Sequence, residues 1–161
     1  MSFEHPLRLL ATFSALELEI NVQTFETRFF VQKNGYFLQE FGANLEYAFG
    51  MYIHGPYSSA LARDAYTLQD LEYEREEIKS VSVNTNACER MRAFMENVNQ
   101  LVSSNKDRQY WLELLASLHF LCKYGYPKIT SLEDARSRSK LAPFGKDIKT
   151  AFHVLKRHKL I

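Results

Sequence analysis

Hydrophobic side chains recur along this chain at intervals of three and four residues, the period of an α-helix that packs by one face. The segments with this period are residues 6–19, 22–41, 59–76, 87–102, 107–123, 132–139 and 146–158. The stretch 107–123 is apolar nearly all round, which is typical of a helix at the centre of a core. The pattern therefore predicts a mainly helical protein.

Capping and turn residues set the limits of the second predicted helix. Asn21 is a suitable N-cap and Thr24 an alternative, and Gly42 is placed to end the helix. The pair Asn34-Gly35 usually marks a turn, so we expect a break or a kink in the middle.

Two segments predict strands. Residues 45–54 alternate loosely and are rich in aromatic residues, and Gly55-Pro56 is expected to end that strand. Residues 77–84 predict a second short strand at a sheet edge, and Ser58 or Ser59 is expected to cap the helix between the two. The predicted fold class is mainly α with a small β element, of the winged-helix-like or helix-turn-helix type.

Residues 103–106 form the clearest linker and divide the chain into two predicted parts. Residues 1–102 would form an acidic helical part with short strands and an HGPYS turn. Residues 107–161 would form a basic part of three helices, resembling a helix-turn-helix, packed on the first.

The net charge of +1 hides an asymmetry along the chain. Residues 1–80 hold 6 basic and 12 acidic side chains, whereas residues 123–161 hold 10 basic and 3 acidic ones. Parts of opposite sign can stabilise each other or face different partners, and the sequence leaves both interpretations open.

The basic segment carries the pattern that indicates DNA binding. Ser131 is expected to cap a short helix, residues 142–145 a turn, and residues 146–158 a helix with separate apolar and cationic stripes. This order is the helix-turn-helix plan, whose last helix enters the major groove. The candidate nucleic-acid-binding residues are Arg136, Arg138, Lys146, Lys149, His153, Lys156 and Arg157. A solvated surface with no partner is the alternative. Because the chain stops at Leu160-Ile161, where a winged helix would begin its wing, we expect no complete wing here.

Three stretches carry a resemblance that covers most of the chain: FFVQKNGYFLQEFG (29–42), FGMYIHGPYSSALARDAYTL (49–68) and WLELLASLHFLCKYGY (111–126). They resemble the bacterial and archaeal YwgA-like proteins and, more remotely, the SocA (Panacea) antitoxin-like domain. The most specific match is His54, Gly55, Pro56, Tyr57 and Ser58, and Gln32-Lys33 also matches, whereas Asn34-Gly35 departs from the family pattern. The resemblance implies regulation through protein partners, and the HGPYS motif itself is interpreted as structural, with a possible partner site around it.

Catalysis is the least favoured interpretation, and we expect no enzyme. His54, Ser58 and Asp64 would allow a hydrolase to be imagined, but no nucleophile elbow is present and a helix cap explains Ser58. The acidic residues Glu72, Glu74, Glu76 and Glu77 lack a converging His or Asp, and His119 fits a buried core position.

Neither a metal nor a cofactor is predicted. Cys88 and Cys122 lie far apart and are expected to be free thiols, and the glycines form no phosphate-binding loop. There is no apolar run of about 18 residues, and the N-terminus does not resemble a signal peptide. We therefore expect a soluble cytoplasmic protein without a membrane partner, which binds double-stranded DNA or, alternatively, a protein. The sequence leaves the oligomeric state open.

Overall fold

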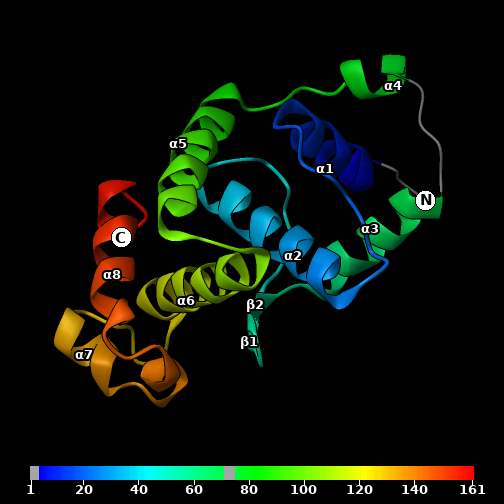
Figure 1. Cartoon of the computed structure of the whole chain (residues 1–161). Coiled ribbons are helices and arrows are strands. Elements are labelled where there is room, and N and C mark those ends of the chain that lie inside the picture. Colours follow the sequence, from blue (N-terminus) through cyan, green and yellow to red (C-terminus); the bar gives the residue numbers. More distant parts are fainter. Residues whose placement is uncertain (1–3, 71–74) are drawn as a thin grey trace. The chain divides into compact units, whose positions relative to one another are not determined.

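The computed structural model of this chain describes residues 4–70 and 75–161, which are mostly helical (Figure 1). The helices are α1 (Glu4–Ala15), α2 (Phe25–Glu40), α3 (Ser59–Asp70), α4 (Arg75–Lys79), α5 (Thr85–Leu101), α6 (Asn105–Tyr124), α7 (Leu132–Ser137), the 3₁₀ helix η1 (Ser139–Phe144) and α8 (Asp147–Arg157). The strands β1 (Gly50–Tyr52) and β2 (Gly55–Tyr57) pair as an antiparallel hairpin. The predicted mainly α fold with a small β element is confirmed.

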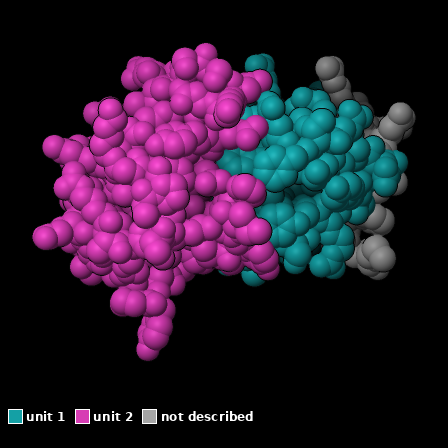
Figure 2. Space-filling model, turned by 60° about the horizontal axis from the view of Figure 1, so that its bottom comes forward, with its two compact units in different colours: residues 1–49, 57–92 teal, residues 50–56, 93–161 magenta. Residues whose placement is uncertain are grey.

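The chain divides into two compact units, which Figure 2 colours separately. The first unit comprises residues 1–49 and 57–92, and the second comprises residues 50–56 and 93–161. The predicted linker at residues 103–106 contains the N-cap of α6, because Ser104 Oγ accepts a hydrogen bond from the backbone N–H of Asp107 at 3.1 Å. The domain boundary predicted there stays a prediction.

The expected break at Asn34-Gly35 is wrong, because α2 runs through both residues as one helix. Glycine is needed at position 35 for packing rather than for a turn. A Cβ placed there would lie 2.8 Å from Cδ2 of Leu61, so a side chain at position 35 would have to displace this buried leucine. Thr24 forms the N-cap, and Gly42 follows the end of the helix with a φ of +113°.

The predicted strand over residues 45–54 is present only from Gly50 to Tyr52. The prediction that Gly55-Pro56 ends this strand is wrong. These two residues begin β2, after a turn at Ile53 and His54. The strand predicted over residues 77–84 is also wrong, because α4 extends to Lys79 and residues 82–84 have no regular structure.

Helix starts follow the capping chemistry that the sequence indicated, with one shift. Ser58 Oγ accepts a hydrogen bond from the backbone N–H of Leu61 at 3.2 Å, which confirms the cap of α3. The sequence predicts Asn86 as the cap of the helix over residues 87–102, but the cap of α5 is Asn84, whose Oδ1 accepts a hydrogen bond from the backbone N–H of Ala87. The predicted extension of α3 beyond Asp70 falls partly outside the described residues.

The second unit is built around α6. Every residue from Trp111 to His119 is buried except the half-buried Glu113, as expected for a helix that is apolar nearly all round. Helix α8 packs on α6, and α7 lies beside the N-terminal end of α8 (Figure 1). The predicted turn at residues 142–145 is largely the 3₁₀ helix η1, followed by Gly145 at a φ of +52°.

Candidate nucleic-acid interface

Helix α8 separates apolar and cationic side chains onto opposite faces. Its buried face consists of Ile148, Ala151, Phe152, Val154 and Leu155. The predicted cations Lys146, Lys149, His153, Lys156 and Arg157 are all exposed. Their spacings of three and four residues place them on one side of the helix, so packing of the apolar stripe leaves the cationic stripe toward solvent.

The two predicted arginines outside α8 differ in what they contact. Arg136, in the last turn of α7, is exposed. Arg138 holds both carboxylate oxygens of Asp134, with Nε 3.1 Å from Oδ1 and Nη2 3.2 Å from Oδ2. This hydrogen bond is the main reason that the pKa of Asp134 is lowered. The Arg138 guanidinium therefore stabilises the end of α7.

Hydrogen bonds fix both ends of α8 within the second unit. At the N-terminal end, the Tyr110 hydroxyl donates to Asp147 Oδ2 at 2.6 Å. Burial, followed by this bond, raises the pKa of Tyr110 to about 12. At the C-terminal end, Asn97 Oδ1 accepts from Arg157 at 3.2 Å and lies 3.0 Å from His158 Nε2. Asp147 is the only acidic residue within α8, and its carboxylate is occupied by Tyr110.

A hollow of about 470 Å³ adjoins the basic face in the same unit. Lys123 and Lys128, at the end of α6 and in the loop that follows, line it together with Lys156 of α8. Its apolar lining includes Ile129 and Phe152, and Lys156 Nζ lies 4.9 Å from the centre of the Phe152 ring. Sequence reasoning missed this hollow, because Lys123 and Lys128 are far from Lys156 in the chain.

Three residues of the HGPYS motif, His54, Gly55 and Ser58, shape or anchor the hairpin and the start of α3. Gly55 has a φ of +97°, which permits the hairpin turn, and His54 Nδ1 lies 2.9 Å from Glu113 Oε1. Ser58 is buried, and the side chain of Gln32 holds its backbone with two bonds of 2.9 Å. This contact accounts for the glutamine that the sequence singled out.

His54, Ser58 and Asp64, which the sequence allowed as a triad, each have a hydrogen-bond partner outside that set. His54 pairs with Glu113, Ser58 Oγ caps α3, and Asp64 Oδ2 accepts from the Tyr47 hydroxyl at 2.6 Å.

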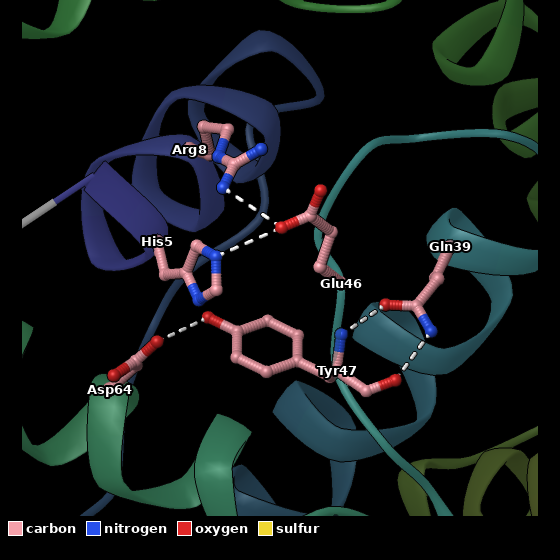
Figure 3. A network of polar contacts seen from close by, with 6 residues as sticks. All are labelled: His5, Arg8, Gln39, Glu46, Tyr47 and Asp64. Carbon is pink, nitrogen blue, oxygen red and sulfur yellow. Dashed lines mark hydrogen bonds and ion pairs between the residues drawn. The ribbon is translucent and has the colours of Figure 1, made fainter.

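A polar network in the first unit was also not foreseen from the sequence (Figure 3). It contains His5, Arg8, Gln39, Glu46, Tyr47 and Asp64. Side chains from α1, α2 and α3 converge there on the extended segment that carries Glu46 and Tyr47. Glu46 has a φ of +63°, which is unfavourable for a residue with a side chain. Its carboxylate lies 3.1 Å from His5 Nε2 and 3.4 Å from Arg8 Nη2, and these contacts help to hold it. Burial and the bond to Asp64 raise the pKa of Tyr47, so its hydroxyl remains a donor. These contacts fasten the segment to the helices.

The remaining candidate chemical groups are one histidine and two cysteines. His119 is buried, with Nε2 3.1 Å from the backbone oxygen of Leu160, as predicted. Cys88 and Cys122 are free thiols, and burial raises the pKa of Cys122 to about 11.

Within residues 4–70 and 75–161, no three His, Cys, Asp or Glu side chains converge to hold a metal ion. The predicted acidic run from Glu72 to Glu77 falls partly outside these residues. No helix in this described part is long and apolar enough to cross a membrane. Comparison of the chain with models of protein families, with curated proteins and with solved structures finds no significant match.

Proposed function

We propose that this protein binds double-stranded DNA through the basic face of α8. The observation that carries the proposal is the exposure of all five cationic side chains on the face of α8 opposite its buried stripe. The order α7, η1, α8 follows the helix-turn-helix plan, in which the last helix enters the major groove.

The electrostatics of α8 suit a polyanion. Lys146, Lys149, Lys156 and Arg157 each carry a formal positive charge at pH 7. Neutralising phosphates with these cations releases counterions, so the logarithm of affinity falls with the logarithm of salt concentration by about 0.9 per phosphate. Four such contacts predict a slope of about −3.6.

Fluorescence anisotropy of a labelled DNA duplex at several salt concentrations tests the proposal. We expect binding at low salt that weakens steeply as salt rises. The variant Lys146→Glu with Lys149→Glu reverses two charges and should lower the affinity at least tenfold, with a slope shallower by about 1.8. These two are chosen because Arg157 is bonded to Asn97, and its replacement would also perturb the fold.

The matched control reverses the same number of charges elsewhere. Arg63 and Lys79 are exposed residues of the first unit, and Arg63→Glu with Lys79→Glu changes the net charge equally. If both double variants weaken binding equally, net charge rather than α8 governs affinity and the proposal fails. Absence of binding at low salt would also refute it.

A protein-interaction function is the second candidate, and one observation favours it. The hairpin exposes Ile53 by 82% and Tyr52 by 57%, while Lys140 Nζ donates to the backbone oxygens of both, at 2.8 and 2.6 Å. A fixed apolar tip of this kind suits contact with another protein. Under this alternative, Ile53→Asp abolishes binding of the partner, whereas the α8 variant leaves it unchanged.

A further inference from the structure

The loop from Gly125 to Lys128, beside the hollow next to α8, is held in a fixed position. The backbone oxygen of Leu121 accepts hydrogen bonds from the N–H groups of Gly125 at 3.2 Å and Ile129 at 3.1 Å. A Cβ at position 125 would lie 2.3 Å from that same oxygen, so only glycine fits the turn. The loop therefore presents its side chains from a defined backbone.

Two tyrosines that frame this turn face solvent. Tyr124 is half-exposed and Tyr126 is fully exposed, although aromatic side chains of this size usually bury most of their surface. Lysines flank them on both sides in the sequence KYGYPK, and Lys123 Nζ lies 5.4 Å from the centre of the Tyr124 ring. Aromatic rings interleaved with cations are the side chains that bind unpaired nucleotides, because bases stack on the rings and phosphates contact the cations.

The hollow itself favours a small anion-bearing ligand. Lys123, Lys128 and Lys156 line it, and none of its lining residues, within the part of the chain that the structure describes, is acidic. Cys122 also lines the hollow, and its thiol is uncharged at neutral pH because burial raises its pKa to about 11. A volume of about 470 Å³ lies within the usual range of small-molecule sites, roughly 300–1,000 Å³.

We infer that this hollow and the loop beside it bind an unpaired nucleotide at the end of the nucleic acid that α8 contacts. Lys156 links the two surfaces, since it belongs to the basic face of α8 and also lines the hollow. The lysines would hold the phosphate, and Tyr126 or Tyr124 would stack on the base. The inference rests on the proposed function for the duplex, but the unpaired nucleotide can be tested separately.

The test compares three labelled probes by anisotropy at one salt concentration. They are a blunt duplex, the same duplex with a short thymidine overhang, and the single-stranded thymidine oligonucleotide alone. We expect the overhang to increase affinity about tenfold, because one base can stack on an aromatic ring. Tyr124→Ala with Tyr126→Ala should remove this increase and leave the blunt duplex unaffected. Tyr124→Phe with Tyr126→Phe is the matched control and should retain it, because the stacking surface remains.

The outcomes separate this inference from the proposed function. Equal affinity for blunt and overhanging duplex, or an increase that survives in the alanine variant, overturns the inference while duplex binding stands. If no duplex binds but the single strand binds in a tyrosine-dependent manner, the proposed function fails and the nucleotide site stands. If none of the three probes binds at low salt, both are overturned.

Discussion

Gly35 in α2 provides a direct test of how the first unit is packed. Its neighbour across the helix contact is Leu61 of α3, which is completely buried. In Gly35→Ala, the new Cβ would lie 2.8 Å from Leu61 Cδ2, well inside van der Waals contact. The leucine must therefore move within a closed environment, or the two helices must separate.

Two opposing effects determine the free energy of unfolding of this variant. Alanine is about 1 kcal/mol more favourable than glycine inside a helix. Forcing an additional methyl group into a packed core costs about 1–3 kcal/mol. The net result should be a destabilisation of up to about 2 kcal/mol, although a glycine inside a helix is normally improved by alanine.

A double-mutant cycle isolates the steric effect. Leu61→Ala alone should cost about 2–5 kcal/mol, because it leaves a cavity. In that background the neighbouring methyl groups are gone, so Gly35→Ala should stabilise the protein by about 1 kcal/mol. The sign of the Gly35→Ala effect thus reverses, and the coupling energy is about 1–3 kcal/mol.

Equilibrium unfolding in urea, followed by circular dichroism, measures all four proteins. The exposed position Glu89 in α5 supplies a control, since Glu89→Ala compared with Glu89→Gly measures the propensity difference without a steric contact. The reasoning is refuted if Gly35→Ala stabilises both backgrounds by the amount that this control gives.

Two further predictions concern titrating groups of the second unit. Tyr110→Phe should destabilise the protein by about 1 kcal/mol at neutral pH, because the bond to Asp147 is lost. The folded-state pKa of Tyr110 is raised from 10.0 to about 12, so its contribution is full below pH 10 and is lost as pH rises toward 12. The unfolding free energies of wild type and Tyr110→Phe should converge over that range, and a constant difference would contradict the assignment. Cys122, with a pKa raised to about 11, should react slowly with a disulfide reagent, as measured in a Cys88→Ser variant. Because only the thiolate reacts, the rate should rise about tenfold for each unit that the pH rises above neutral. A rate equal to that of a free cysteine would contradict the raised pKa of this thiol.

Local patterns predicted the helices and most of their caps. The caps at Ser58 and Ser131, and Gly42 after α2, depend on bonds within a few residues, so the sequence contains the information. The break expected at Asn34-Gly35 did not occur, because the contact that decides it is with Leu61, in another helix. Turn propensity describes the isolated segment, whereas close packing of two helices selects glycine for its size.

The β element shows the same limit. Residues 45–54 alternate as a strand does, but a strand needs a ladder partner, and the only pairing in the described chain is the three-residue hairpin of β1 and β2. A Gly-Pro pair usually marks a turn, yet here the φ of +97° at Gly55 turns the chain so that strand pairing resumes at once.

In the candidate interface too, the features that depend on nearby residues could be predicted, and those that depend on distant residues could not. The basic face of α8 was predictable, because one helical period places its cations together and its apolar residues opposite. The engagement of Arg138 by Asp134 was also within reach, since the two stand four residues apart at a helix end. The hollow was not predictable, because folding brings Lys123 and Lys128 to Lys156 across a long stretch of chain.

Charge composition alone would therefore overstate the binding surface of the second unit. Among its basic residues, the guanidinium of Arg138 is bonded to Asp134, and the ammonium of Lys140 is bonded to backbone oxygens of the hairpin. Both charged groups therefore already have partners within the protein. The exposed cations that remain include those of α8, Arg136 and the lysines of the hollow. The salt dependence of binding should accordingly reflect these groups, with a slope of about −3.6 for the blunt duplex. The overhanging duplex should give a steeper slope if its additional phosphates contact Lys123 and Lys128, as we propose. A common slope for both probes would mean that the hollow contributes no ionic contact, even if the tyrosines stack on the base.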